Sequence, residues 1–374
     1  MTAILILLLT GQILHENFDD PSALEAWERM DGAVTGDGPY SVASIDDGAL
    51  MLEGVESTKR WLALTRTVPV GDAKWLRISA RMRTMSVSPE TARYQNCNLF
   101  FRFGRRALQR TRVLSGTNDS LEVARRLEVP EGAEEITVGC FLSMPGKAWF
   151  DDVMIEAVEP PAWKTAGTEH YRYHWLAGDA VWEQARKYNE QSYVLVSEFF
   201  ERRDPIKVAY YKYPDRDTKE EYTGNRGNAH IRGGDIHSIW PSDRHEIVHI
   251  LCREWGDPPV ILGEGIAVYL SGKWLGKSLK EAGREVAAGG KWVSIANLLD
   301  TGKFRSHSDL VTYPIAGSFV QWLVETRGKD TLRKLYGALR NTASSEDNRG
   351  AFKEVLDLSV EQANLKLITT LRVS

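Results

Sequence analysis

The sequence of 374 residues is poor in cysteine and histidine and has no strong excess of either charge. It contains three cysteines and eight histidines, its formal net charge is −4, and no dense block of lysine and arginine occurs. A nucleic-acid-binding surface is therefore not expected. Hydrophobic residues make up 43% of the chain and charged residues 26%, which is normal for a soluble globular protein and argues against disorder.

Long hydrophobic runs are also absent, since no segment reaches the ~20 apolar residues that a transmembrane helix needs. The apolar run Ala3–Leu9 resembles the central part of a secretory signal, although no basic residue precedes it. A buried N-terminal strand is the alternative. We predict that residues 1–12 are a signal segment and that the protein is exported, to the periplasm or outside the cell. No cysteine follows the run, so a lipid anchor is not indicated.

The scarcity of cysteine limits what disulfides can do here. Cys97 and Cys140 could pair in an oxidising compartment, which would leave Cys252 over. Alternatively, all three could be buried free thiols, and the sequence does not decide between the two.

Residues 13–158 have a sequence pattern typical of short strands separated by turns. Helix-length periodic runs are scarce, and several segments alternate apolar with polar residues or are rich in β-branched and aromatic residues. Turn chemistry recurs at residues 35–40 and 115–120. We predict a β-sandwich, with strands in segments 60–70, 74–84, 98–104, 135–142 and 147–156.

The segment VEPPAWKTAGTEH (158–170) interrupts this pattern with two adjacent prolines and small residues. We predict a linker at 159–168 and a second domain at 169–374. That domain is predicted to be α+β and, from His245 onward, mainly helical. Its clearest patterns indicate strands at 170–175 and 207–213 and helices at 179–203, 317–328 and 359–371.

The segment DRHEIVHILCREW (243–255) contains the pattern H-E-x-x-H at His245, Glu246 and His249. Residues four apart lie on one face of a helix, so both imidazoles could bind one metal ion at ~2.0–2.1 Å. Glu246 is displaced round the helix, where its carboxylate could act as a general base on a metal-bound water. The alternative is an ordinary amphipathic helix with this pattern by chance.

A second helix pattern follows in GDPPVILGEGIAVYLSG (256–272) and carries Glu264. A hairpin of two helices would bring this carboxylate back to the histidine face and complete a His₂Glu site with an open fourth position, the ligand set of a catalytic zinc. Alternatively, Glu264 only begins a helix, where its charge suits the helix dipole. Both patterns demand the same tertiary arrangement, so we favour a metal ligand.

The segments RHEIVHIL, LGEGIAVYLSG and YPIAGSFVQWLVETRG, in this order, resemble the peptidase MA-like, gluzincin-type zinc metallopeptidases, which are distantly related to thermolysin. The resemblance covers roughly residues 165–374. It implies that His245, His249 and Glu264 bind one zinc ion and that Glu246 is the general base of peptide-bond hydrolysis.

The resemblance has further implications and two departures. It implies that residues 227–240 form the edge-strand region before the zinc helix, where an extended substrate could add as a strand. Tyr313 falls where a phenol could polarise the scissile carbonyl, or it is a core tyrosine. Thermolysin has an acid four residues after its ligand glutamate, whereas Val268 stands here. The glycine-x-methionine-glutamate-asparagine segment of gluzincin aminopeptidases is absent, which weakens an aminopeptidase assignment.

The remaining metal-binding residue types are interpreted as structural. Cys252 lies two helical turns beyond the first histidine of the pattern, so we expect a packing thiol and not a ligand. His170 and His174 lie on an alternating segment, where residues four apart are ~13 Å from each other, too far for one metal. His230 and His237 lie near the predicted cleft and could contact substrate, but structural roles are favoured.

The first domain has a resemblance of its own. Residues 16–32 and 146–156 resemble the first and last parts of jelly-roll carbohydrate-binding modules, which implies a jelly roll, glycan or glycoprotein binding, and a structural calcium. The candidate calcium ligands are Glu16, Asp151 and Asp152, for which ordinary surface acids are the alternative. The candidates for stacking on sugars are Trp61, Trp75, Tyr94 and Phe101, each of which could equally belong to the core.

We therefore predict an exported, two-domain zinc metallopeptidase that cleaves peptides or proteins, as an endopeptidase. The alternative is a glycan- or protein-binding surface protein with a catalytically silent metallopeptidase-like scaffold. His245, Glu246, His249 and Glu264 are all present, which counts against that alternative because a scaffold needs no general base.

Overall fold

The computed structural model describes residues 11–33, 42–54, 60–88, 97–143 and 145–373. Contacts within the chain divide it into two units, each with its own hydrophobic core. The first unit comprises Met1–Trp163, Leu176–Gly178 and Tyr213–Asn228; the second comprises Lys164–Trp175, Asp179–Lys212 and Ala229–Ser374. The predicted signal run Ala3–Leu9 and the predicted turn at 35–40 lie outside the described residues.

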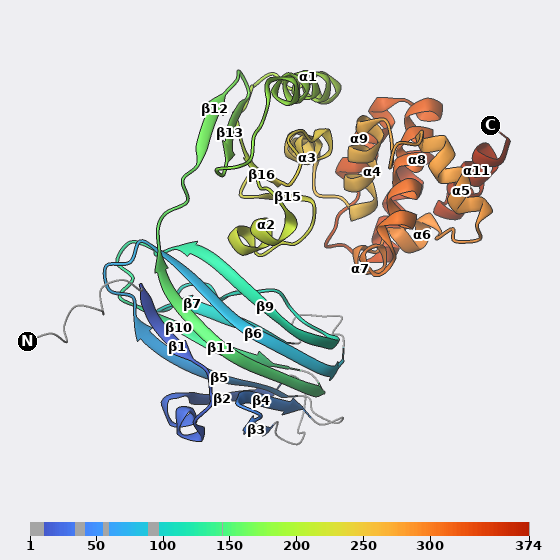
Figure 1. The fold of residues 1–374 in the computed structure, drawn as a ribbon. Helices are drawn as coiled ribbons and strands as arrows, with labels where there is room; N and C mark the ends of the chain where they lie inside the picture. The colour runs from blue at the N-terminus through green and yellow to red at the C-terminus, as the bar shows by residue number, and fades with distance from the viewer. Residues whose placement is uncertain (1–10, 34–41, 55–59, 89–96, 144, 374) are drawn as a thin grey trace, which may run out of the picture. The chain divides into compact units, whose positions relative to one another are not determined.

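The first unit is a β-sandwich of two antiparallel sheets (Figure 1). One sheet has the order β3-β4-β11-β6-β9, with β1 also paired to β11, and the other has the order β2-β5-β10-β7-β8. The bounds are β1 Gln12–Glu16, β2 Glu28–Ala33, β3 Val42–Asp46, β4 Ala49–Gly54, β5 Arg60–Pro69, β6 Trp75–Val87, β7 Cys97–Phe103, β8 Gln109–Arg110, β9 Gly116–Glu128, β10 Glu135–Leu142 and β11 Gly146–Val158, with a 3₁₀ turn at Pro21–Ala26.

Alternation along the strands builds the core of the sandwich. Every second residue points to the same face of a sheet, so Leu50 and Leu52 of β4 are both fully buried, as are Val138 and Cys140 of β10 in the other sheet. These residues belong to one buried cluster. The observed strand bounds confirm all the strands predicted between residues 60 and 156.

The structure corrects one predicted turn of the first domain and shows the state of its two cysteines. The turn predicted at 115–120 is wrong, because β9 begins at Gly116. Its first residues pair irregularly with β6, and these register shifts accommodate the turn-type residues within a strand. Cys97 and Cys140 are free and buried in adjacent strands, so the structure has thiols where a disulfide was one of two options.

Helix α2 (Arg216–Thr223) belongs to the first unit, although the predicted boundaries placed it in the second domain. Ion pairs hold it on the sandwich. The guanidinium of Arg112 donates to both carboxylate oxygens of Glu220, and Arg77 and Arg126 both donate to Glu221. Such long-range pairing has no signature in local sequence.

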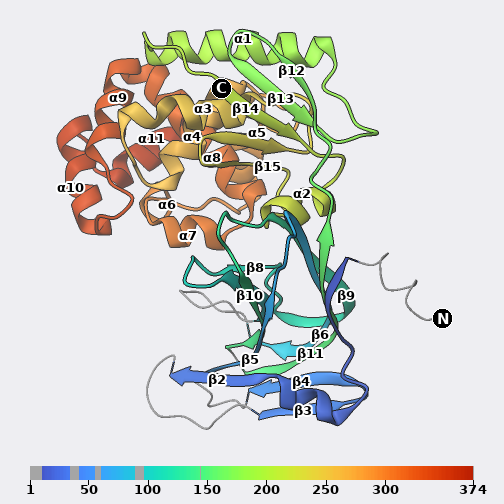
Figure 2. The ribbon, with the colours of Figure 1, turned by 90° about the vertical axis from the view of Figure 1, so that its left-hand side faces the viewer.

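The second unit contains a mixed five-stranded sheet with the order β12-β13-β14-β16-β15. Strands β13, β14 and β16 are parallel, and the two edge strands are antiparallel to their neighbours. Tyr171, Tyr173 and Tyr210 are buried on one face, which α1 covers (Figure 2). The bounds are β12 Lys164–Gly167, β13 Tyr171–Trp175, β14 Val208–Lys212, β15 Ala229–Arg232, β16 Asp235–Ser238 and α1 Glu183–Phe200.

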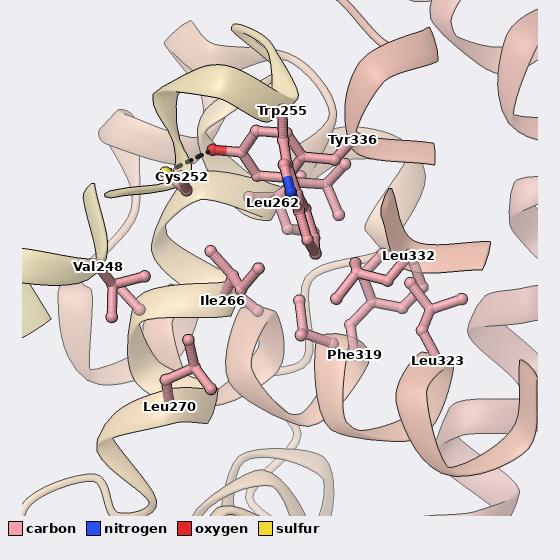
Figure 3. Close-up of a cluster of buried hydrophobic side chains, with 14 of the residues drawn as sticks. Val248, Cys252, Trp255, Leu262, Ile266, Leu270, Phe319, Leu323, Leu332 and Tyr336 are labelled. Atoms are coloured by element: carbon pink, nitrogen blue, oxygen red, sulfur yellow. Dashed lines mark hydrogen bonds between the residues drawn. The ribbon is translucent and has the colours of Figure 1, made fainter. Parts of the chain in front are cut away.

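The rest of the second unit is helical, as predicted. The bounds are α3 Arg244–Leu251, a 3₁₀ turn Cys252–Trp255, α4 Val260–Ser271, α5 Leu279–Ala288, α6 Ile295–Leu298, α7 Thr301–Ser306, α8 Asp309–Arg327, α9 Lys329–Ala338, α10 Ser345–Leu356 and α11 Val360–Val373. A buried cluster joins the 3₁₀ turn to α3, α4, α8 and α9, as Figure 3 shows around Trp255, Ile266 and Phe319.

Two predicted boundaries in this part need correction. Residues 164–167 of the predicted linker form β12, which pairs with β13. The helix predicted at 317–328 begins eight residues earlier, at Asp309, because Ser308 caps it and Pro314 is accommodated inside it. Within the described part of the chain, no helix is long and apolar enough to cross a membrane.

Candidate metal centre

Helix α3 presents the H-E-x-x-H residues because its start is fixed by Asp243. The Oδ1 atom of Asp243 accepts hydrogen bonds from the backbone N–H groups of His245 (2.9 Å) and Glu246 (3.3 Å), as an N-cap residue does. His245 and His249, one turn apart, then point to the same side of the helix. Their ring centroids are 4.8 Å apart.

Helix α4 brings the third candidate ligand to this face. The chain leaves α3 through the 3₁₀ turn and reverses at Gly256, whose φ of 138° suits glycine. Pro259 is the N-cap of α4. The helices α3 and α4 pack against each other, and Glu264, in the second turn of α4, faces both histidines.

Three ligand atoms converge at one point. The Nε2 atom of His245 lies 3.0 Å from the Oε2 atom of Glu264 and 3.1 Å from the Nε2 atom of His249, and the distance from His249 Nε2 to Glu264 Oε2 is 3.3 Å. Tetrahedral zinc with bonds of about 2.0–2.1 Å separates its ligand atoms by about 3.3 Å. The triangle therefore has the dimensions of three corners of a zinc site, and the two nitrogens and one carboxylate are donors that zinc accepts.

The electrostatics of this triangle differ between the members. Burial alone would lower the pKa of His245, but its hydrogen bond to Glu264 and the charge of that carboxylate outweigh burial and raise the pKa to about 9. Burial would raise the pKa of Glu264, but the two histidines outweigh it and hold that pKa far below the ordinary value. Without a metal, a proton on His245 thus balances the carboxylate.

Glu246 lies beside the triangle and is not part of it. Its side chain is buried, at 8% exposure, and burial followed by the charge of Asp243 raises its pKa to about 7. A carboxylate with a pKa near neutrality is matched to proton transfer at neutral pH.

Helix α8 places Tyr313 beside the candidate ligand His245. Its ring stacks on His245 with centroids 6.0 Å apart and on Trp274 at 4.9 Å. Burial and then the negative charge of Glu264 raise the pKa of the phenol, so it keeps its proton at all working pH values. The structure therefore brings a protonated Tyr313 to the candidate ligands.

Close packing of α4 on α8 explains that placement. A Cβ added at Gly265 would lie 2.6 Å from the carbonyl oxygen of Ala316, so only glycine lets the helices meet there. Glu264 directly precedes Gly265 in α4, and Tyr313 lies one helical turn before Ala316 in α8. Val268, where thermolysin has an acid, is buried against Gly317 of α8, so this position is part of the helix–helix contact.

Asp243 is a site residue that our sequence reasoning missed. Its carboxylate is buried, its Oδ2 atom has no hydrogen-bond partner in the described structure, and burial raises its pKa. Asn189 of α1 fixes it by accepting from its backbone N–H. The signal was present, because an aspartate three residues before Glu246 has the spacing of a helix N-cap.

The edge-strand region predicted at 227–240 forms the hairpin β15–β16, and β15 is an edge strand of the sheet. The hairpin histidines pack in a row of rings that crosses four strands. His230 stacks on His237 at 5.2 Å, His237 on Tyr211 at 4.9 Å, and Tyr211 on His174 at 4.5 Å. Their contacts agree with the structural role favoured from the sequence.

The other residues set aside as ligands are also used in packing. Cys252 is buried, and its Sγ atom lies 3.1 Å from the hydroxyl oxygen of Tyr336 (Figure 3). His170 stacks on Tyr193 with centroids 3.9 Å apart and bonds Glu190 through Nδ1. Neither residue joins the triangle.

The calcium candidates have partners of their own. Arg66 donates to Glu16 at 2.8 Å, and His15 lies 3.1 Å from Asp152. Among the described residues, His245, His249 and Glu264 are the only group of three or more potential metal-ligating side chains whose ligand atoms lie within 4.8 Å of one another. The calcium site stays a prediction without a preformed group of side chains.

The candidate sugar-stacking residues have different surroundings. Phe101 is fully buried in the core of the sandwich, so it cannot offer a face to a sugar. Trp75 packs on Tyr222 of α2 at 6.4 Å, and the half-buried Trp61 stacks on Phe141 at 6.0 Å. Tyr94 lies outside the described residues.

Comparisons with known proteins gave matches to solved structures alone. No model of a protein family matches the sequence, and no curated protein does. The enzymatically active domain of tailspike protein 4 from bacteriophage CBA120 is 12% identical, with a TM-score of 0.27, and the match covers 38% of this chain but 20% of that chain.

Two carbohydrate-binding modules also match. A CBM4 chain is 14% identical over 39% of this chain and 94% of that chain, with a TM-score of 0.26. The CBM22-1 xylan-binding domain from Paenibacillus barcinonensis is 12% identical over 40% of this chain and 97% of that chain, also with a TM-score of 0.26. The two antiparallel sheets of the first unit and the buried cluster of their side chains define it as a β-sandwich.

Proposed function

We propose that the protein is a zinc-dependent peptidase that hydrolyses peptide bonds by direct attack of water. One observation carries the proposal: the Nε2 atoms of His245 and His249 and the Oε2 atom of Glu264 lie 3.0–3.3 Å from one another, beside the buried carboxylate of Glu246. These three residues would hold the zinc ion. A binding scaffold has no need for a carboxylate with a raised pKa next to a ligand triangle.

A zinc ion held by these residues would supply a Lewis acid, which at a site of this kind would lower the pKa of a bound water to about 7 and polarise a substrate carbonyl. Glu246 accepts the proton of the attacking water and later returns it to the leaving amine. In the zinc-free protein, burial and the charge of Asp243 raise the pKa of Glu246 to about 7, so this carboxyl group binds a proton more readily than an exposed glutamate does. No side chain becomes covalently attached to the substrate.

Tyr313 would support the same step. Its protonated hydroxyl can donate a hydrogen bond to the oxygen that becomes negative as water attacks the carbonyl. Strand β15 lies at an edge of the sheet, where an extended peptide could add as a further strand, and we propose an endopeptidase. Export to the periplasm or cell exterior belongs to the same proposal.

The direct test is the variant Glu246→Gln, assayed on a mixed peptide library with zinc supplied. We expect zinc to be retained, because the ligands are untouched, and the cleavage rate to fall by about 10²- to 10⁴-fold with loss of the base. Glu354→Gln is the matched control, since Glu354 is an exposed glutamate of α10 away from the site. Cleavage by Glu246→Gln at the wild-type rate would overturn the mechanism.

A further inference from the structure

A cavity of about 290 Å³ opens beside two of the candidate zinc ligands. His249 and Glu264 line this cavity together with Arg253 and Arg305. Arg253 comes from the 3₁₀ turn after α3, and Arg305 comes from α7. Two segments far apart in the sequence thus each contribute an arginine to the lining of the cavity that the metal ligands share.

Both arginines are exposed. In the described part of the chain, neither Arg253 nor Arg305 has a carboxylate oxygen within 4.0 Å. The nearby Arg202 differs, because it forms an ion pair with Glu254 at 2.8 Å. Apart from Glu264, whose charge a zinc ion would neutralise, Asp257 is the lone acid among the lining residues, so the cations outnumber it.

Gly263 provides an independent sign that the cavity is kept open. Glycine inside a helix costs stability relative to alanine, so a helical glycine needs a reason. A Cβ on Gly263 would meet a single neighbour, the hydroxyl of Tyr336, at 4.0 Å, which is ordinary contact. Helix packing therefore does not require glycine here, unlike at Gly265, and its effect is to leave room next to Glu264.

We propose that this cavity binds a carboxylate of the peptide substrate between Arg253 and Arg305. The planar guanidinium group pairs with carboxylates through two parallel hydrogen bonds, so two such groups suit a carboxylate well. This inference rests on the proposed peptidase function and adds the substrate class, which is peptides with a negative group close to the cleaved bond.

The carboxylate has two sources that the structure treats alike. It is either the C-terminal carboxylate of a peptide or the side chain of an aspartate or glutamate. Matched peptides separate them: one with a free C-terminus against its C-terminal amide, and one with an internal glutamate against glutamine. If the amide binds more weakly than the free C-terminus, the site binds the C-terminal carboxylate. If the glutamine peptide binds more weakly than the glutamate peptide, the site binds an acidic side chain.

The first readout is binding, measured by calorimetry on zinc-loaded Glu246→Gln, which does not consume the peptide. We expect Arg253→Gln and Arg305→Gln each to weaken binding of the acidic peptide about tenfold and to leave its neutral partner unchanged. Lys303→Gln is the matched control, because it removes a positive charge from α7 outside the cavity and should have no effect.

A second variant tests the cavity without touching a charge. Gly263→Leu should fill the space beside Glu264 and weaken acidic and neutral peptides together, while zinc content stays at the wild-type value. In the otherwise wild-type enzyme, Arg253→Gln should raise KM for acidic peptides with little change in kcat.

The outcomes distinguish this inference from the proposed function. If the enzyme cleaves the acidic and the neutral peptide of each pair with equal efficiency, and neither arginine variant changes this, the carboxylate site is overturned. The proposed peptidase function would still stand. Absence of cleavage of any peptide by the zinc-loaded wild type overturns the proposed function itself, and the carboxylate site with it.

Discussion

At the scale of residues, the candidate site is a balance of charges that zinc binding must change. In the metal-free protein, His245 carries a proton because Glu264 lies 3.0 Å away and raises the histidine pKa to about 9. Zinc binds the neutral imidazole, so the proton has to leave when the metal arrives. Metal binding and proton release are therefore linked.

The first prediction follows from that linkage. Zinc binding near pH 7.5 should release about one proton from His245, and the affinity should weaken about tenfold for each pH unit below 9. The zinc affinity falls as the pH falls, because a proton competes with zinc for His245 and stays bound at pH values below the raised pKa of this histidine. Calorimetry in buffers with different heats of protonation counts the released protons, and a count of zero would contradict the assigned ligand.

The second prediction concerns Tyr313. Tyr313→Phe removes the hydroxyl but keeps the ring that stacks on His245, so zinc content and stability should be unchanged. The rate kcat should fall about 10²-fold, because a hydrogen bond to the developing oxyanion is lost. Steady-state kinetics check this, and an unchanged kcat would assign Tyr313 to packing alone.

At the scale of elements, helix contacts decide whether the ligands meet. The cap at Asp243 sets the start of α3, and the contact of Gly265 with Ala316 sets the distance between α4 and α8. Neither residue would touch the metal. Each acts by positioning a helix that carries ligands or Tyr313.

The third prediction uses two glycines of α4 as a matched pair. Gly265→Ala places a Cβ 2.6 Å from the Ala316 carbonyl oxygen, so it should destabilise the protein by about 1–3 kcal/mol. Gly263→Ala has open space and gains helix propensity, so it should stabilise by about 0.5–1 kcal/mol. Urea unfolding of the metal-free proteins compares them, and equal effects would refute the packing argument.

Sequence reasoning succeeded where the determinant is local. The two-residue period of the strands and the four-residue spacing of His245 and His249 both follow from the geometry of one element. It failed where partners lie far apart in the chain. The pairing of Arg112 with Glu220 and the cavity between Arg253 and Arg305 depend on tertiary contacts that no local pattern records.

At the scale of the whole molecule, the chain combines a β-sandwich with a mixed sheet and a helical region. The order of units along the sequence is not simple, because α2 belongs to the sandwich although β14 and β15 on either side of it belong to the second unit. An N-terminal fragment that ends at the predicted linker would therefore lack α2, and its Arg112 would lose the partner Glu220.

The central claim is a zinc ion held by His245, His249 and Glu264, and zinc content per chain tests it most directly. Metal analysis of the wild type and Glu264→Ala, both after exposure to zinc, is the measurement. The account predicts about one zinc per wild-type chain and a large loss in the variant, since two histidines alone hold the ion weakly. Wild-type protein without zinc, or equal zinc in both proteins, would contradict it.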